Sequence, residues 1–99
     1  MPELPELDPV IHGKLRLAIL SLLSAVAEAE FTYLRNQTGS TDGNLGAHIL
    51  KLEQAGYVSV KKTFIRRKPT TIYRLTERGR TAFTSYVRNL KQLLGGQLQ

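Results

Sequence analysis

The stretch from Leu45 to Thr76 restricts the possible folds more than any other part of the chain. Apolar residues in its first third recur at i, i+4 and i+7, the spacing of one helical face: Leu45, Ile49 and Leu52. Gly56 ends this pattern, and residues 57–64 and 70–75 are then rich in β-branched and aromatic side chains. We therefore expect a helix, a glycine stop and two strands in this order.

The segment between the two expected strands carries the densest positive charge of the chain. Residues 65–69 (IRRKP) lack the glycine pairs that favour a tight two-residue turn, so we expect a longer loop. Five basic side chains lie within eight residues in and before it: Lys61, Lys62, Arg66, Arg67 and Lys68. A helix followed by a basic hairpin is the arrangement of a winged helix-turn-helix, in which one helix enters a DNA major groove.

The N-terminal half predicts an arm and a first helix. Residues 1–8 are acidic and proline-spaced, which favours an extended arm. Asp8 and Pro9 are typical of a helix start, and the apolar spacing that follows predicts a helix from about 9 to 26. Its expected buried face consists of Ile11, Leu15, Ala18, Leu22 and Val26, widened by Leu17, Leu20 and Leu23.

Threonines mark the start of the other three helices. We expect Thr32 to cap a short helix over 33–38 that Gly39 ends. Thr41 begins a recognition helix over 41–55, and Thr76 begins a last helix over 76–94. Gly56 suits a left-handed C-cap. The predicted fold is mainly α with a small β-hairpin (α+β): an arm over 1–8, then a winged-helix domain over 9–96 with a three-helix core, a wing and a C-terminal dimerisation helix.

Composition excludes several classes of protein. Ninety-nine residues form one domain, and the longest apolar stretch is interrupted by charged and polar side chains, so no membrane span is expected. The chain has no cysteine and its N-terminus does not resemble a signal peptide, which favours the cytoplasm. Residues 1–50 carry three basic and six acidic side chains, whereas residues 51–99 carry eleven basic and two acidic ones. This asymmetry indicates a polyanionic partner or a solvated basic surface.

The sequence does not predict an enzyme. His12 and His48 lie on different expected helices, and neither has the spacing of a metal ligand pair. The glycines between 39 and 43 follow no strand and precede no lysine, as a phosphate-binding loop would require. We therefore expect no catalytic residues, no metal and no cofactor.

Nucleic-acid binding explains the same residues with fewer assumptions. Small or polar groups on the expected recognition helix offer hydrogen bonds to base edges: Thr41, Asn44, Ala47 and His48. Asn44 is suited to a two-bond pairing with adenine. Backbone and wing contacts are expected from Lys51, Lys61, Lys62, Thr63, Arg66, Arg67, Lys68, Thr70 and Thr71.

The last helix carries an apolar stripe that a core of this size is not expected to cover. The stripe consists of Phe83, Tyr86, Val87, Leu90 and Leu94. Exposed apolar patches of this kind mark interaction surfaces. We therefore expect a two-fold homodimer through this helix, assisted by the first helix.

Several segments together resemble the single-domain winged-helix transcriptional regulators related to the MarR and ArsR groups. These segments are Arg16 with Ile19-Leu20, TDGNL at 41–45, HILKLEQAGYV at 48–58 and the pattern T-x-Y-x-L-T-x-x-G-R at 71–80. The resemblance covers residues 10–94 and implies a dimer on a pseudo-palindromic operator, with double-stranded DNA as partner. It places recognition on residues 41–51 and the wing on 61–71. Metal sensing of the ArsR kind uses cysteines, which this chain lacks.

Two rival interpretations remain open at the level of sequence. A winged helix also serves in protein contacts, and a basic one also binds nucleic acid without sequence preference. A small-molecule effector between the first and last helices is likewise left open. Salt dependence and the ratio of specific to random DNA binding distinguish these functions.

Overall fold

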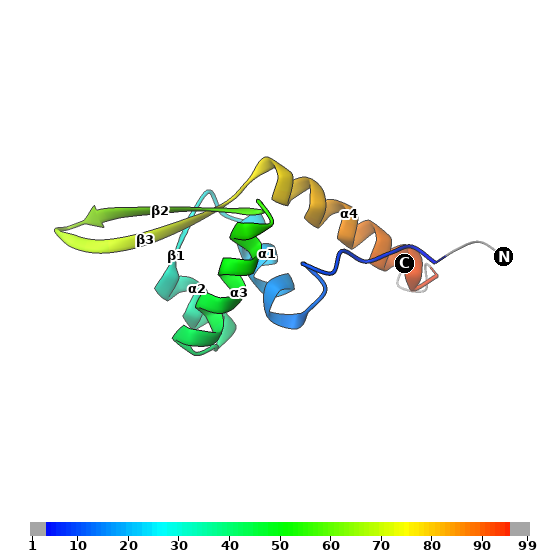
Figure 1. The fold of residues 1–99 in the computed structure, drawn as a ribbon, viewed down its shortest axis with the longest axis horizontal. Coiled ribbons are helices and arrows are strands. Elements are labelled where there is room, and N and C mark those ends of the chain that lie inside the picture. The colour runs from blue at the N-terminus through cyan, green and yellow to red at the C-terminus, as the bar shows by residue number, and fades with distance from the viewer. Residues whose placement is uncertain (1–3, 96–99) are drawn as a thin grey trace.

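The computed structural model describes residues 4–95, which form four helices and a three-stranded antiparallel sheet (Figure 1). The elements follow in the order α1 (Lys14–Ser24), β1 (Ala29–Glu30), α2 (Phe31–Thr38), α3 (Asp42–Gln54), β2 (Val58–Ile65), β3 (Lys68–Leu75) and α4 (Glu77–Leu93). This is the expected α+β winged-helix architecture. The molecule is elongated, 59 × 25 × 23 Å, because the β2–β3 hairpin and α4 extend from the helical body in opposite directions (Figure 1).

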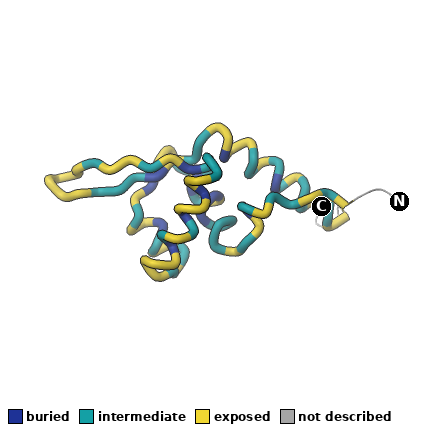
Figure 2. Tube along the Cα trace, in the orientation of Figure 1, coloured by how far each residue is buried: buried dark blue, intermediate teal, exposed yellow. Residues whose placement is uncertain are grey.

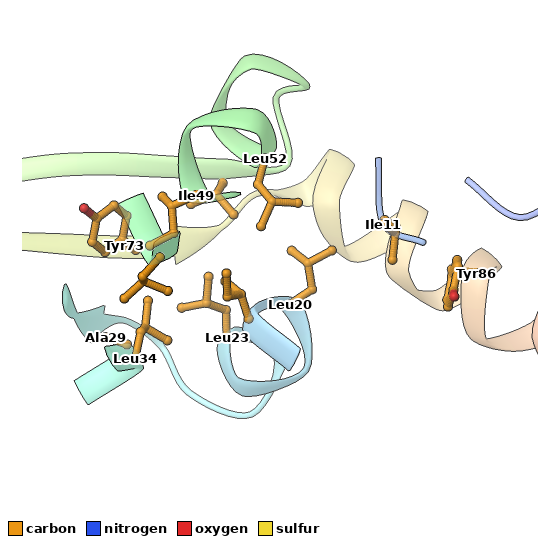
Figure 3. Packing of buried hydrophobic residues seen from close by; sticks show 12 residues of the cluster. Ile11, Leu20, Leu23, Ala29, Leu34, Ile49, Leu52, Tyr73 and Tyr86 are labelled. Carbon is orange, nitrogen blue, oxygen red and sulfur yellow. The ribbon is translucent and has the colours of Figure 1, made fainter. Parts of the chain in front are cut away.

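The core lies where α1, α2 and α3 meet the base of the hairpin (Figure 3). Its fully buried side chains from the three helices are Ile19, Leu20, Leu23, Leu34, Leu45 and Leu52. The predicted stripe of α3 is therefore confirmed, whereas the predicted face of the first helix is right only in part. Ile11, Leu20 and Leu23 are fully buried, as predicted. Leu15, Ala18 and Leu22 are only partly buried, and the buried Ile19 was not part of the predicted face. Leucines on all sides of this helix made its orientation ambiguous.

The first helix is also shorter than expected, since α1 begins at Lys14 and ends at Ser24 rather than spanning 9–26. The Asp8 carboxylate does accept a hydrogen bond from the Val10 amide at 2.9 Å, but this cap begins only one turn. Gly13 follows with an extended backbone that separates the turn from α1. The second carboxylate oxygen of Asp8 accepts from the Tyr57 hydroxyl, so the turn is fixed to the segment after α3.

The segment before α2 also differs from the expectation. Helix α2 begins at Phe31, and Glu30 rather than Thr32 is its N-cap, without a side-chain hydrogen bond. The two residues before it form β1, a strand that the sequence did not predict, which pairs with β3 through Ala29–Tyr73 and Glu30–Ile72. A two-residue strand has no periodicity to detect.

The hairpin corrects another expectation. Strands β2 and β3 pair without interruption from Val58–Leu75 to Ile65–Lys68, so only Arg66 and Arg67 form the turn. Both have positive φ values, 52° and 66°, as a type I′ turn requires. The expected long loop is therefore wrong, because two arginines adopt a conformation that normally favours asparagine and glycine.

The predicted caps of the last two helices are confirmed. The Thr41 hydroxyl accepts from the Asn44 amide at 3.2 Å, and the Thr76 hydroxyl accepts from the Gly79 amide at 2.9 Å. Gly56 adopts the left-handed conformation expected after α3, with φ of 80°. Helix α4 ends at Leu93, one residue before the expected end.

Candidate nucleic-acid interface

Helix α3 is held on the body by one apolar face and by an ion pair at its start. Leu45 and Leu52 are fully buried and Ile49 nearly so. Arg35 of α2 donates to the Asp42 carboxylate at 3.0 Å, which fixes the first turn of α3 against α2. The rest of the first turn is open to solvent, since Thr41 and Asn44 are exposed.

The exposed face of α3 contains most of the residues expected to read DNA, together with others that the sequence analysis missed. Ala47 and Lys51 are exposed, as predicted. Leu50, which is 50% exposed, and Gln54 share this face with Ala47 by helical spacing. Leu50 lies outside the i, i+4, i+7 stripe of this helix, so the same spacing rule could have predicted its exposure.

His48 lies on the flank of α3 beside α1 and is half-buried. Arg16 of α1 donates from Nη1 to His48 Nδ1 at 2.8 Å. The same guanidinium donates to the carbonyl oxygens of Val10 and Pro9, so it joins α3 to the turn before α1. The sequence singled out Arg16 only as part of the family pattern and gave no signal of this contact.

The contact with Arg16 determines which hydrogen bonds His48 can make. A guanidinium only donates, so Nδ1 of His48 must accept and the ring proton of the neutral side chain resides on Nε2. Burial lowers the pKa of His48, and the positive charges of Arg16 and Lys51 lower it further, which favours this neutral form. His48 therefore presents a single donor at Nε2.

The wing is a positively charged ribbon. All five predicted basic side chains are exposed: Lys61, Lys62, Arg66, Arg67 and Lys68. None of them forms an ion pair within residues 4–95, and the sequence has no acidic residue between Glu53 and Glu77. The three predicted threonines, Thr63, Thr70 and Thr71, are half-buried along the same ribbon. Figure 2 shows that the outer part of the hairpin is largely exposed.

Helix α4 presents two differently covered sides. Phe83, Val87 and Leu90 are partly buried and Leu94 is 41% exposed. Together with polar neighbours, Phe83 and Val87 line a shallow groove of about 450 Å³. Tyr86 lies on the other side, 3% exposed, with its hydroxyl 2.9 Å from His12 Nδ1. A side chain covered in this way by its own chain is not available to a partner in this conformation.

Two other kinds of site are absent from the described part of the chain. Residues 4–95 contain no group of three or more His, Cys, Asp or Glu side chains placed to hold a metal ion. Within the same range, no helix is both long and apolar enough to cross a membrane.

The three-helix body, the sheet at its side and the basic hairpin define a winged helix-turn-helix protein. A family model for the winged helix DNA-binding domain matches residues 15–94. The chain belongs to this family, and its fold is that of winged-helix transcription regulators.

Individual relatives agree with this assignment. An uncharacterized protein of Methanocaldococcus jannaschii is 39% identical over 84 residues, which cover 85% of this chain and 91% of that protein. The transcriptional regulator homologue of Pyrococcus horikoshii OT3 superposes with a TM-score of 0.82 at 29% identity, over 88% of this chain and 86% of that one. The transcriptional repressor CouR, solved bound to a 23-mer DNA duplex, shares the fold with a TM-score of 0.75 at 22% identity. That match covers 91% of this chain and 63% of CouR.

Proposed function

We propose that this chain is a cytoplasmic, homodimeric transcription regulator that binds double-stranded DNA with sequence preference and is not an enzyme. The observation that carries the proposal is the wing, whose five basic side chains are exposed and without ion-pair partners in the described residues. The ribbon follows α3 directly in the chain, and the exposed face of α3 carries small or polar groups in its first half, Asn44 and Ala47. The solved CouR complex shows that a protein with this fold binds a DNA duplex.

Sequence reading is assigned to α3. Asn44 and Ala47 are exposed in its first half, where a recognition helix contacts base edges. Asn44 supplies both a donor and an acceptor, which matches adenine. His48 supplies only its Nε2 donor, which matches acceptors such as N7 of a purine or O4 of thymine. Thr41 caps the helix and lies at the same open end.

Affinity without sequence preference is assigned to the wing and Lys51. Each phosphate neutralised by a lysine or arginine releases counterions, so binding weakens with salt. The half-buried threonines of the ribbon add neutral phosphate hydrogen bonds. The exposed arginines at the turn suit the backbone or the minor groove, where arginine is favoured.

Dimerisation is assigned to the open side of α4. Phe83, Val87, Leu90 and Leu94 lie at steps of four, three and four, so they share one face. The far end of α4 extends away from the helical body, as Figure 1 shows, so a partner can reach this face without displacing the core. Two copies related by a two-fold axis would present their α3 helices to two half-sites of a pseudo-palindrome.

The turn geometry gives a clean test of the wing. Arg66 and Arg67 already occupy positive φ, where asparagine and glycine are favoured, so Arg66→Asn with Arg67→Gly keeps the turn and removes two charges. We expect this variant to bind all DNA sequences more weakly. A plot of the logarithm of the binding constant against the logarithm of the salt concentration should become less steep. The slope should decrease in magnitude by up to about 0.9 for each phosphate that the wing no longer neutralises. Arg80→Ala removes an exposed positive charge from α4 and is the control for loss of charge outside the wing. An unchanged salt slope would remove the wing from the interface.

Selection of bound duplexes from random DNA tests the whole proposal. We expect recovery of a pseudo-palindromic sequence, bound by two copies of the chain. Val87→Glu should produce a monomer in sedimentation, whereas Thr81→Glu, at an exposed position elsewhere on α4, should not. A native chain that is monomeric at tens of micromolar and binds single half-sites would contradict the dimer. Binding without sequence preference would favour the non-specific alternative.

A further inference from the structure

The tip of the wing exposes a large aromatic side chain. Phe64 is 72% exposed, whereas Phe31 and Phe83 are both partly buried. Its neighbour Ile65 is 40% exposed. An interpretation that assigns the wing to charge alone leaves these apolar groups without a role.

The register of the hairpin places a second apolar residue beside Phe64. Phe64 pairs with Pro69, and the next pair, Ile65–Lys68, closes the two-residue turn. A closing pair of this kind is hydrogen bonded, so the Phe64–Pro69 pair is of the non-hydrogen-bonded type, in which opposing side chains are closest. Proline is accepted there because its missing amide proton is not needed by the ladder. Phe64 and Pro69 therefore form one apolar step next to the turn.

The surroundings of this step indicate the chemistry of its partner. The side chains that flank it in the hairpin are Lys62, Arg66, Arg67 and Lys68, all exposed. Their combined charge matches a polyanion. An aromatic side chain among unpaired cations is the combination with which proteins bind the faces of bases beside phosphates.

We propose that Phe64, supported by Pro69, is an apolar wedge that enters between two base pairs from the minor groove and bends the DNA. This inference rests on the proposed function of the chain. The two-residue turn makes the end of the ribbon narrow, and the arginines at that turn are attracted to the negative potential of the minor groove. Apolar side chains inserted there unstack one base step and kink the duplex.

The wedge also predicts which DNA step is used. Unstacking costs least at pyrimidine–purine steps, so we expect TA or CA to be preferred where the wing tip meets the duplex. This preference would arise at positions that α3 does not contact. It would extend the recognised sequence beyond the major-groove contacts of each half-site.

The experiment uses the full chain and a duplex recovered by selection from random DNA, with 2-aminopurine placed at each adenine in turn. The native chain should raise the fluorescence at one step in each half-site, and dyes on the duplex ends should report a shorter end-to-end distance. Phe64→Ala should abolish both signals and weaken binding by about tenfold. Phe64→Leu should retain part of the bend, because leucine also serves as a wedge.

Leu4→Ala is the matched control, since Leu4 is 73% exposed and belongs to the N-terminal arm. The arm runs on the opposite side of the helical body from the hairpin (Figure 1). It should leave affinity, fluorescence and bend unchanged. If Phe64→Ala binds with the native bend and fluorescence, the wedge is wrong while the proposed function stands. If Phe64→Ala instead changes self-association in the absence of DNA, the partner of this step is a second copy and the wedge is also overturned. If the native chain binds no DNA at any salt concentration, the proposed function itself fails.

Discussion

Helices α3 and α4 begin with the same local pattern, yet the rest of the molecule surrounds the two beginnings differently. Each starts with a threonine cap followed by an acidic residue, Thr41-Asp42 and Thr76-Glu77, and each has a glycine in its first turn. In both, the threonine hydroxyl accepts from the amide three residues later. The local chemistry of the two starts is thus nearly identical.

The start of α4 is closed by packing. The Thr76 hydroxyl also donates to the carbonyl oxygen of Gly56 at 2.6 Å, which fixes α4 to the segment after α3. Gly79 is buried, and a Cβ atom at that position would lie 2.1 Å from the carbonyl oxygen of Tyr57. The helix can approach this backbone only because residue 79 has no side chain.

The start of α3 is open. Thr41, Gly43 and Asn44 are exposed, and a Cβ atom at Gly43 would have no neighbour within 4 Å. The amides of an uncovered helix start remain available to a phosphate group, and its side chains remain available to base edges. A capping pattern thus specifies where a helix begins, whereas tertiary packing decides whether that beginning is buried or stays open to a partner.

The glycines in the two first turns give the largest expected contrast. We predict that Gly79→Ala lowers the free energy of unfolding by about 3 kcal/mol, because the methyl group must displace the Tyr57 backbone. Urea denaturation of the purified chain would measure this change. Gly43→Ala, in the open start, is the control and should alter stability by no more than about 1 kcal/mol. Equal losses of stability for the two substitutions would contradict the description of the α4 start as closed and the α3 start as open.

Asn44 occupies in α3 the position that Gly79 occupies in α4. Because its side chain is exposed, we expect Asn44→Ala to leave the melting temperature nearly unchanged. It should weaken binding to the selected duplex by about 1–3 kcal/mol and relax the preference at one base pair per half-site. Leu52→Ala, which opens the core below α3, should show the reverse, a loss of about 2–5 kcal/mol in stability. If base preference survives Asn44→Ala, the reading face of α3 is assigned wrongly.

Much of this comparison was accessible from the sequence. Threonine caps, the glycine after α3 and the strands of the hairpin follow from residue types and their spacing, because these features depend on neighbours within a few positions. The order of helix, strand and strand then determined the winged-helix class. The exposed basic side chains of the wing were predicted for the same reason, since a run of charge has no favourable place in a small core.

Two features that the sequence did not predict depend on distant parts of the chain, and one wrong prediction concerns the hairpin turn. The contact between Arg16 and His48 joins residues that are 32 positions apart, and no local pattern announces it. The sequence also gave no reason for glycine at position 79. Only glycine fits there because the backbone of Tyr57 occupies the space that a Cβ atom would need. The turn at Arg66 and Arg67 was misjudged because continuous strand pairing imposes a backbone conformation that arginine disfavours.

The two threonine caps should differ less than the two glycines do. Thr76→Ala removes the cap and leaves the half-buried Gly56 carbonyl without its partner, so we expect a loss of about 2 kcal/mol. Thr41→Ala removes only an exposed cap and should cost about 0.5–1 kcal/mol. Serine at either position retains the hydroxyl and serves as the control. A larger loss at Thr41 than at Thr76, measured by thermal unfolding, would reverse the comparison.

The smallest expected effect concerns His48, the side chain on the flank of α3 that Arg16 contacts. Burial and the nearby charges of Arg16 and Lys51 lower the pKa of His48 from its usual value of 6.5. The unfolded chain therefore takes up a proton at a higher pH than the folded chain does. The contribution of His48 to stability is complete above about pH 6.5 and is lost as the pH falls through the lowered pKa.

Replacing His48 with glutamine, which keeps an amide near the position of Nε2 but does not titrate, should flatten this dependence. We expect the melting temperature of the native chain to fall more steeply below about pH 6.5 than that of His48→Gln, with the two curves parallel above it. Arg16→Met removes one of the nearby charges and should give an intermediate slope. If all three proteins lose stability equally on acidification, the Arg16–His48 contact does not hold the ring in its neutral form. His48 would then be free to donate from both ring nitrogens, and its assignment as a single donor to base acceptors would fail.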